Sequence, residues 1–419
     1  MIAHPPHDTQ GGRGVAGTPV RGARVDDAAA RGVPVHDGAP HGRSMHAGLE
    51  PDCPVRPTAC VTSGGATRAL PEADGPLLDV ARLRHIAVIR ALPGLGDLLC
   101  TVPALRALRR GSPSARITLV GLPGAEWFVE RFRWYVDDLL VLPSWPSIPE
   151  AVGTPSTTLA MLAGPLPPFG LALQLQGSGG PINGLGRALG ARVVVGHERQ
   201  AGRRGDTWLR RWPTTGHESE RIHDLAVWAG FPFAGDHLEF PELPGDAAAA
   251  DAFLGPCTDR LVVVHPGASR PDRRWSAEGF AAVADRLADG GATVVVTAGR
   301  AERSLAQELA ARCRTSPRVA PPMPVGSLAA LVRRAAALVV NDTGVAHLGV
   351  AVGTPTVVVG TTSDLDRWGP ADRVRHRVVR TTGVLGLDVD DVAGAAEDVL
   401  RQGAGWTAPR AVSTPVTAS

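Results

Sequence analysis

The stretch ALVVNDTGVAHLGVAVGTPTVVVG, residues 337–360, contains two short valine-rich runs with a helix pattern between them. The runs 337–342 and 354–360 have the length and the β-branched content of strands that are buried on both faces. The segment between them consists mainly of small residues and carries His347. Strands that alternate with helices predict a parallel sheet that helices cover on both faces.

The same alternation extends upstream, where valine-rich runs at 260–265 and 292–297 indicate two more strands. Helical spacing separates the runs, at residues 277–287, 302–312 and 328–336. We therefore predict a doubly wound α/β unit over residues 257–403.

An earlier series of the same kind lies within residues 84–240. Five runs in it have the composition of strands, at residues 85–90, 116–121, 136–142, 171–175 and 191–196. Residues 98–110 have helical spacing, and the proline- and glycine-rich segment 231–256 predicts a linker. A chain of 419 residues is long enough for two domains. Two Rossmann-like units in tandem predict a cleft between them at the strand ends.

Both ends of the chain, residues 1–80 and 404–419, are predicted to be disordered tails. Residues 1–80 have almost no aromatic or long aliphatic side chains, so they cannot bury enough apolar surface to fold. The first residues lack the apolar region of a secretory signal, and no later stretch has the pattern of a membrane span.

The composition favours a globular, cytoplasmic protein. The net charge of +2 gives no reason to expect a nucleic-acid partner. The five cysteines are scattered and odd in number, so we expect a reducing compartment and no zinc site. The sequence has no lysine, and therefore any site that needs a cation must use one of its arginines.

Three loops carry the residues of chemical interest, and the first follows the run 85–90. Gly94 and Gly96 allow a tight turn there, and Asp97 stands where a helix begins. Asp97 is an N-cap in one interpretation and a functional carboxylate in the other. Two glycines without a third are a weak dinucleotide fingerprint, and no acidic residue follows at the ribose-binding spacing, so a nicotinamide enzyme is disfavoured.

The second loop follows the run 260–265 and begins His265-Pro266-Gly267. It contains one hydroxyl and three cations, Ser269, Arg270, Arg273 and Arg274. Ser276 is placed to cap the next helix. Arginine side chains and free backbone N–H groups near a helix N-terminus favour a diphosphate site, and the alternative is a solvated basic turn.

The third loop is Asn341-Asp342-Thr343-Gly344, which follows a predicted buried strand and leads into the helix of His347. Asp342 or Thr343 can cap that helix. His347 alone would be a buried structural histidine, but its place at a strand's carboxyl end favours ligand contact. We expect the N–H groups of Thr343 and Gly344 to contact a second phosphate.

Together these loops resemble glycosyltransferase family 9, the ADP-heptose lipopolysaccharide heptosyltransferases. The Gly-Asp pattern of that family, followed by a proline and a leucine-rich helix, is matched by Gly96-Asp97 and residues 101–105. Its His-Pro-Gly loop is matched by 265–275, and its Asn-Asp-Ser/Thr-Gly-x-x-His signature by 341–347. The order and spacing agree over about residues 84–400.

The resemblance implies a GT-B fold, with 84–240 as the acceptor-binding domain and 257–403 as the nucleotide-sugar-binding domain. It implies an inverting, metal-independent transfer of a heptose-like sugar from an ADP-sugar to a lipopolysaccharide-core-like, surface-glycan or lipid-linked acceptor. Asp97 would be the general base, in an acceptor-side loop with Gly94 and Gly96. No cofactor besides the nucleotide-sugar co-substrate is expected.

Donor-binding positions also follow from the resemblance. The residues expected at the diphosphate are Ser269, Arg273, Asp342, Thr343, Gly344 and His347. Gly299 and Glu302 are expected at the nucleotide, although Glu302 could instead cap a helix. The family usually has lysine where Arg273 stands, so a planar, forked cation replaces a point charge.

Three weaker patterns have a structural and a functional interpretation. The aromatic residues of 126–138 fit a core, or a surface in peripheral contact with the inner face of the membrane. Arg203, Arg204, Arg210 and Arg211 fit a solvated loop, or a site for a phosphorylated acceptor. The pairs Asp364/Asp366 and Asp388/Asp390 resemble metal-binding motifs, but we interpret them as turn and cap residues.

Two rival functions remain at this point: a nucleotide-sugar epimerase of the same fold, and a noncatalytic nucleotide-sugar binding protein. An epimerase usually has further acidic residues in its cleft, whereas only Asp97 is evident here. A binding protein would have no need of Asp97 in its Gly-Asp setting.

Overall fold

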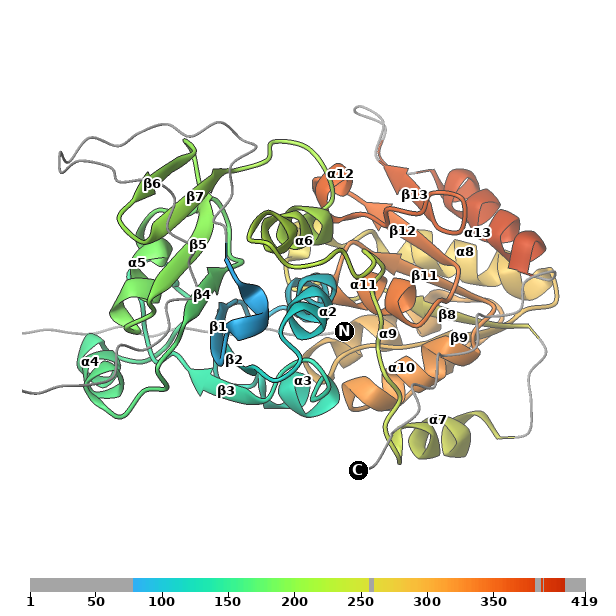
Figure 1. Ribbon diagram of the computed structural model, residues 1–419. Helices are drawn as coiled ribbons and strands as arrows, with labels where there is room; N and C mark the ends of the chain where they lie inside the picture. Colours follow the sequence, from blue (N-terminus) through green and yellow to red (C-terminus); the bar gives the residue numbers. More distant parts are fainter. Residues whose placement is uncertain (1–77, 256–259, 381–385, 387, 404–419) are drawn as a thin grey trace, which may run out of the picture. The chain divides into compact units, whose positions relative to one another are not determined.

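The computed structural model describes residues 78–255, 260–380, 386 and 388–403 (Figure 1). The predicted tails therefore lie outside the described residues except for 78–80, and so do Cys53, Cys60 and Cys257. Within the predicted tail, Val80 begins a short 3₁₀ helix, η1 (Val80–Arg82). The described residues all lie within one compact unit of the chain, and their strands form two sheets.

The first sheet has seven strands in the order β3-β2-β1-β4-β5-β7-β6. Its strands are β1 (His85–Ile89), β2 (Arg116–Gly121), β3 (Asp138–Val141), β4 (Leu171–Gln174), β5 (Val193–Glu198), β6 (Gly202–Arg204) and β7 (Thr207–Arg211). All pairings are parallel except that of β6 with β7. The five predicted strands are present.

The arginine-rich segment after β5 is not the loop that its sequence predicts. Arg203 and Arg204 lie in β6, and Arg210 and Arg211 lie in β7, so the segment extends the sheet. Trp208 is largely buried, and Cζ of the Arg203 guanidinium lies over the Trp208 ring, 4.3 Å from the ring centroid. Because arginine occupies several of these positions, the sequence lacks the alternation of apolar and polar residues that would have indicated a strand.

The helices of this part are α1 (Leu95–Leu99), α2 (Val102–Gly111), α3 (Glu126–Arg131), α4 (Pro155–Ala163), α5 (Pro181–Ala188) and α6 (Glu218–Trp228). The single helix predicted over 98–110 is therefore two. The break falls at Cys100 and Thr101, and Pro103 stands in the first turn of α2, where its missing N–H leaves no hydrogen bond unmade.

The second sheet has six parallel strands in the order β10-β9-β8-β11-β12-β13. They are β8 (Leu261–His265), β9 (Thr293–Val296), β10 (Arg318–Val319), β11 (Ala337–Asn341), β12 (Thr356–Gly360) and β13 (Arg377–Arg380). The four predicted strands are present, and β10 and β13 extend both edges. The strand order reverses between β8 and β11, which is where ligands bind in such sheets.

Helices cover both faces of the second sheet. They are α8 (Ala277–Asp289), α9 (Arg303–Arg312), α10 (Val325–Arg334), α11 (Gly344–Ala351), α12 (Leu365–Trp368) and α13 (Val389–Gly403), with the 3₁₀ helices η2 (Pro271–Arg273) and η3 (Arg300–Glu302). Val262 and Val264 belong to the hydrophobic core that contains residues of α8 and α13, whereas Val263 belongs to the core that contains residues of α10 and α11. This alternation confirms the doubly wound architecture.

The predicted linker 231–256 carries a helix, α7 (Asp246–Leu254), which packs against α10. Its alanine run is helix-forming, and Gly245 and Gly255 bound it. No helix in the described ranges has the length and apolar character needed to cross a membrane.

Candidate active site

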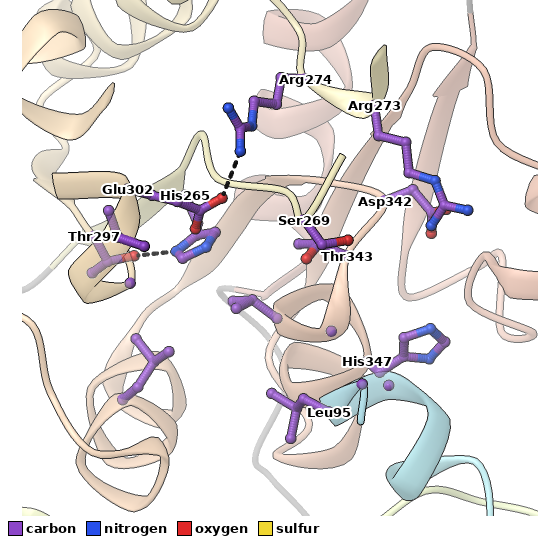
Figure 2. A pocket seen from close by; sticks show the side chains of 18 of the residues that line it. Leu95, His265, Ser269, Arg273, Arg274, Thr297, Glu302, Asp342, Thr343 and His347 are labelled. Carbon is purple, nitrogen blue, oxygen red and sulfur yellow. Dashed lines mark hydrogen bonds and ion pairs between the residues drawn. The ribbon is translucent and has the colours of Figure 1, made fainter. Parts of the chain in front are cut away.

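A cavity of about 680 Å³ lies where the α1 loop of the first sheet meets the strand ends of the second. Residues 94–97 line one side of it, and the loops after β8, β9 and β11 line the other. Ten of the lining side chains are labelled in Figure 2. The structure thus brings all three predicted loops, and every predicted site residue, to one cavity.

Asp97 lies in the first turn of α1, while Gly94 occupies the N-cap. The interpretation of Asp97 as an N-cap is therefore wrong. Its carboxylate is 27% exposed, and Oδ1 lies 3.5 Å from Nη2 of Arg90. Burial raises the pKa of Asp97, and this effect outweighs the lowering by Arg90, Arg367 and Arg273. Asp97 is thus a partly buried carboxylate with a higher proton affinity than a free aspartate.

Two glycines allow α1 and α11 to approach closely. A Cβ on Gly96 would lie 2.4 Å from Cδ2 of His347, and a Cβ on Gly344 would lie 2.8 Å from Cβ of Leu95. Only hydrogen at both positions leaves room for this contact. The two helices bring the first turn that carries Asp97 next to the N-terminus of α11.

The second loop has a different arrangement from the predicted one. Ser269, Arg273 and Arg274 line the cavity, but Arg270 is exposed and pairs with Asp272. Ser276 caps α8 as predicted, by accepting from the Gly279 N–H. The N-terminus of α8 does not line the cavity, however, so the prediction of a cradle at that helix is wrong. α11 supplies the helix N-terminus instead.

Arg273 is placed to meet an anion. It is half-buried at the end of η2, and its guanidinium has no hydrogen bond or ion pair with the other described residues. Its charge lowers the pKa values of both Asp97 and Asp342 against the larger effect of burial. Figure 2 shows its guanidinium beside Asp342 at the edge of the cavity.

Asn341, the first residue of the third loop, is a structural brace. Its Nδ2 donates to Pro266 O at 2.7 Å, and its Oδ1 accepts from the Trp275 N–H at 3.0 Å. The side chain is fully buried, so it holds the second loop against the end of β11. The first residue of the third loop therefore has a packing role.

The following residues form the start of α11. Thr343 is the N-cap, but neither it nor Asp342 makes a side-chain capping bond. The N–H of Asp342 is bonded to Val359 O, whereas the first N–H groups of α11 have no partner within the helix. Burial raises the pKa of the Asp342 carboxyl. The N–H groups of Thr343 and Gly344 are therefore the backbone donors at this terminus, and their contact with a phosphate stays a prediction.

His347 is almost completely buried beside α1. Its Nδ1 lies 3.8 Å from Sγ of Cys100, and its ring centroid lies 6.2 Å from that of Trp368. Burial lowers the pKa of His347 to about 3, and that of His265 to about 4. Both imidazoles are neutral at physiological pH, so neither brings a positive charge to the cavity.

The side of the cavity where the nucleotide is expected lies beyond the second loop. Glu302 accepts from Arg274 Nη2 at 3.4 Å, and a Cβ on Gly267 would lie 2.4 Å from its Oε2. His265 Nδ1 lies 3.0 Å from Thr297 Oγ1. Glu302 occupies the N-cap position of α9 but makes no capping bond, so capping does not account for it.

Sequence reasoning missed three charged residues next to Asp97. Arg90 follows β1 and is fully buried, Glu218 begins α6, and Arg367 lies in α12. They are linked to one another by ion pairs. Strong burial of a charged residue has no signature in a single sequence. Among the described residues, no group of three or more His, Cys, Asp or Glu is arranged to hold a metal ion.

Two doubly wound units that contribute to one cavity define the GT-B class of fold. A glycosyltransferase family 9 structure from Veillonella parvula has a TM-score of 0.63 and 21% identity, over 78% of this chain and 99% of that one. The structure of ADP-heptose lipopolysaccharide heptosyltransferase II from E. coli has a TM-score of 0.59 and 18% identity, over 76% of this chain and 99% of that one. These matches confirm the predicted fold.

Part of the sequence also matches a known family. Residues 189–383 match the model of glycosyltransferase family 9 (heptosyltransferase), which confirms the resemblance that the loops indicated. That match contains the second and third loops and begins after the first. The lipopolysaccharide core heptosyltransferase OpsX of Haemophilus influenzae is 25% identical over 175 residues, which are 40% of this chain and 50% of that protein. The chain thus matches about half the length of this curated relative.

Proposed function

We propose that the protein is an inverting, metal-independent glycosyltransferase that moves a heptose-like sugar from an ADP-sugar to a lipopolysaccharide-core-like, surface-glycan or lipid-linked acceptor. The observation that carries the proposal is the single cavity that Asp97 shares with Arg273 and the N-terminus of α11. A carboxylate on one side and an anion site on the other are what direct displacement of a nucleoside diphosphate requires.

Asp97 acts as the general base in this proposal. The acceptor hydroxyl gives its proton to the Asp97 carboxylate while its oxygen forms a bond to the anomeric carbon, and the bond from that carbon to the diphosphate breaks. Attack from the face opposite the leaving group inverts the anomeric centre. The raised pKa of Asp97 suits this role, because a stronger base takes the proton more readily.

The leaving diphosphate gains negative charge during the reaction. Arg273 and the backbone N–H groups of Thr343 and Gly344 are the groups that stabilise it. Ser269 adds a hydroxyl donor on the same side of the cavity as Arg273. His347, in α11, packs beside α1 as a neutral ring. The carboxylate of Asp342 would repel a phosphate, so we assign it to the sugar hydroxyls next to the diphosphate.

The donor nucleotide is proposed by analogy with relatives. The similar E. coli enzyme is an ADP-heptose lipopolysaccharide heptosyltransferase, and the similar OpsX protein is a lipopolysaccharide core heptosyltransferase. Gly299 and Glu302 are the residues proposed to contact the nucleotide, with Glu302 accepting hydrogen bonds from ribose hydroxyls. A cytoplasmic location, with peripheral contact at the inner face of the membrane, stays a prediction.

The test combines donor binding with transfer. Thermal shift with ADP-heptose, other nucleotide sugars and NAD identifies the donor class, and transfer to truncated lipopolysaccharide core is then measured for wild type and Asp97→Asn. We expect stabilisation by ADP-heptose and a loss of kcat of about 10²–10⁴-fold in Asp97→Asn. The variant should bind the donor as wild type does, because the amide keeps the shape of the side chain.

Each arm has an outcome that contradicts the proposal. Stabilisation by NAD alone would rule out a nucleotide-sugar enzyme. Full transfer by Asp97→Asn would remove Asp97 as the base. Conversion of the nucleotide sugar to an epimer without transfer would identify an epimerase, and donor binding without turnover of any acceptor in the panel would favour a binding protein.

A further inference from the structure

Four charged side chains form a connected series from the cavity into the interior: Asp97, Arg90, Glu218 and Arg367, which we call the ion-pair series. Arg90 Nη2 lies 3.5 Å from Asp97 Oδ1, Arg90 Nη1 lies 3.1 Å from Glu218 Oε1, and Arg367 Nε lies 2.8 Å from Glu218 Oε2. The series contains residues from β1's end, α1, α6 and α12. It therefore links α1 and α6, which follow strands of the first sheet, to α12, which follows a strand of the second sheet, next to the proposed base.

Arg90 divides its hydrogen bonds unequally between the two carboxylates. Its Nη1 donates to Glu218 and, at 2.5 Å, to Leu175 O. Its Nε donates to the main-chain oxygen of Asp97 at 3.2 Å, whereas the contact of Nη2 with the Asp97 carboxylate is the longest of the set. The guanidinium is thus bound mainly to Glu218 and to backbone oxygens.

Glu218 has no access to a ligand. Its side chain is 1% exposed, and it does not line the cavity. Burial alone would raise its pKa, but Arg90 and Arg367 outweigh burial and lower it, so Glu218 carries a negative charge. An ionised carboxylate this deeply buried is costly unless it is fully paired, and both of its oxygens are paired here.

We propose that Glu218 is a positioning residue for Asp97: it engages Arg90 so that the Asp97 carboxylate stays free to accept a proton from the acceptor. The inference rests on the proposed role of Asp97 as the base. Without Glu218, Arg90 would turn its full charge to Asp97 and make a short bidentate pair. A carboxylate held in that way is a weaker base, because the neighbouring cation favours its ionised form.

Arg367 has the opposite effect in this arrangement. It competes with Arg90 for Glu218, and it also places a positive charge near Asp97. Removing Arg367 leaves both oxygens of Glu218 to Arg90 and removes that charge. The two substitutions should therefore shift the proton affinity of Asp97 in opposite directions, which a general loss of structure would not produce.

Other charged and titratable groups near Asp97 can also influence its pKa. Arg273 approaches from η2 and carries a positive charge that lowers the pKa of Asp97. His217 at the start of α6 and His347 in α11 both have pKa values lowered by burial, so both are neutral above about pH 6.5. Burial raises the pKa of the Cys100 thiol, which stays protonated. The ion-pair series and Arg273 thus dominate the field at Asp97.

The experiment measures the pKa of Asp97 in the full-length protein by carbon NMR, with aspartate labelled at the carboxyl carbon. The signal that Asp97→Asn lacks belongs to Asp97. We expect its pKa to fall by about one pH unit in Glu218→Gln and to rise by about half a unit in Arg367→Gln. Arg380→Gln is the matched control, because Arg380 pairs with Asp366 of the same helix α12 but does not touch Glu218. It should leave the pKa unchanged.

Transfer kinetics with ADP-heptose and truncated lipopolysaccharide core give a second readout. The base must be ionised, so activity falls as the pH drops through the pKa of Asp97. The acidic limb should therefore move to lower pH in Glu218→Gln and to higher pH in Arg367→Gln. At the plateau, kcat of Glu218→Gln should fall about three- to tenfold, with the donor KM within about twofold of wild type.

The outcomes separate this inference from the proposed function. An unchanged Asp97 pKa in Glu218→Gln, or shifts of the same sign in both variants, would overturn the role of Glu218 even if Asp97→Asn abolished transfer. Full transfer by Asp97→Asn would instead refute the base. If Glu218→Gln does not fold, Arg367→Gln decides the matter: a pKa that stays the same or falls contradicts the inference. Glu218→Asp, which keeps the carboxylate, should have most of the wild-type activity whether or not Glu218→Gln folds.

Discussion

At the scale of single residues, this protein shows how charge is distributed where only arginine supplies a fixed positive charge. Three arginines in or near the cavity are already engaged: Arg274 with Glu302, and both Arg90 and Arg367 with Glu218. Arg273 lines the cavity without such a bond. A free guanidinium next to a helix N-terminus is suited to bind a diphosphate, because its planar donors can contact two phosphate oxygens at once.

Arg273→Ala should weaken ADP-heptose binding about 10- to 100-fold, which corresponds to about 1.5–3 kcal/mol for a hydrogen bond to a charged group. Isothermal titration calorimetry with ADP-heptose measures the change. Arg270→Ala is the control in the same loop, since Arg270 is exposed and pairs with Asp272. Equal losses in the two variants would show that the effect is a general one of charge, and wild-type affinity in Arg273→Ala would move the phosphate site elsewhere.

At the scale of elements, the contact between α1 and α11 places the proposed base next to the proposed phosphate site. It depends on Gly96 against His347 and on Gly344 against Leu95, where any Cβ would meet the opposite helix. α1 has only five residues and little stability of its own, so its position derives from this packing.

Gly96→Ala should therefore separate the two helices, lower the free energy of unfolding by about 1–3 kcal/mol and reduce kcat for transfer. Chemical denaturation and transfer kinetics test this. Gly394→Ala in α13 is the control, because a Cβ there meets nothing within 4 Å. That variant should be stabilised by about 0.5–1 kcal/mol with unchanged activity. Wild-type stability and turnover in Gly96→Ala would show that the close approach is not needed.

At the scale of the whole molecule, the linker is fastened to both α/β units. Asp246 at the start of α7 accepts two hydrogen bonds from Arg131 of α3, at 2.6 and 3.0 Å. On the other side, Arg333 of α10 donates to Phe240 O, and a Cβ on Gly326 would lie 1.9 Å from Asp246 Oδ1. The segment that follows the first sheet is thus a packed element that ties α3 to α10.

Asp246→Asn should lower the free energy of unfolding at pH 7 by about 1.5–3 kcal/mol, because the pair with Arg131 is largely buried. Burial would raise the pKa of Asp246, but hydrogen bonds from Arg131 and the Leu243 N–H, with the charges of Arg131 and Arg333, outweigh burial and lower it. A lowered pKa means that the ionised pair stabilises the fold above the unfolded-state value and loses this effect as the pH falls through the folded-state value.

Denaturation of wild type and Asp246→Asn at several pH values tests the linkage. The stability difference should be constant above about pH 5 and shrink below the ordinary aspartate pKa of about 4. Arg286→Ala, which removes exposed ion pairs with Asp390 and Glu397, should change stability little at any of these pH values. A difference for Asp246→Asn that does not depend on pH would contradict an ionic role.

The sequence by itself determined the two doubly wound units and the three loops. Valine runs at strand length and helices at 3.6-residue spacing are local patterns, and β8, β9, β11 and β12 lie where those patterns predict. The strands β6, β7, β10 and β13, which lie at or next to a sheet edge, were missed, because short or arginine-rich strands in such places need no continuous apolar run.

Only the tertiary structure decided which groups surround Asp97. Arg90 and Glu218 are 128 positions apart in the sequence, and Glu218 and Arg367 are 149 apart. Their burial and pairing depend on how α1, α6 and α12 pack, and no local pattern records that. Tertiary packing also decides that the N-terminus of α11, and not that of α8, faces the cavity. Likewise, Asn341 is a structural brace only because folding places Pro266 within reach of its side chain. The pattern of apolar residues is set by each segment's own burial, whereas the electrostatics of a site arises from charges that only the folded chain brings together.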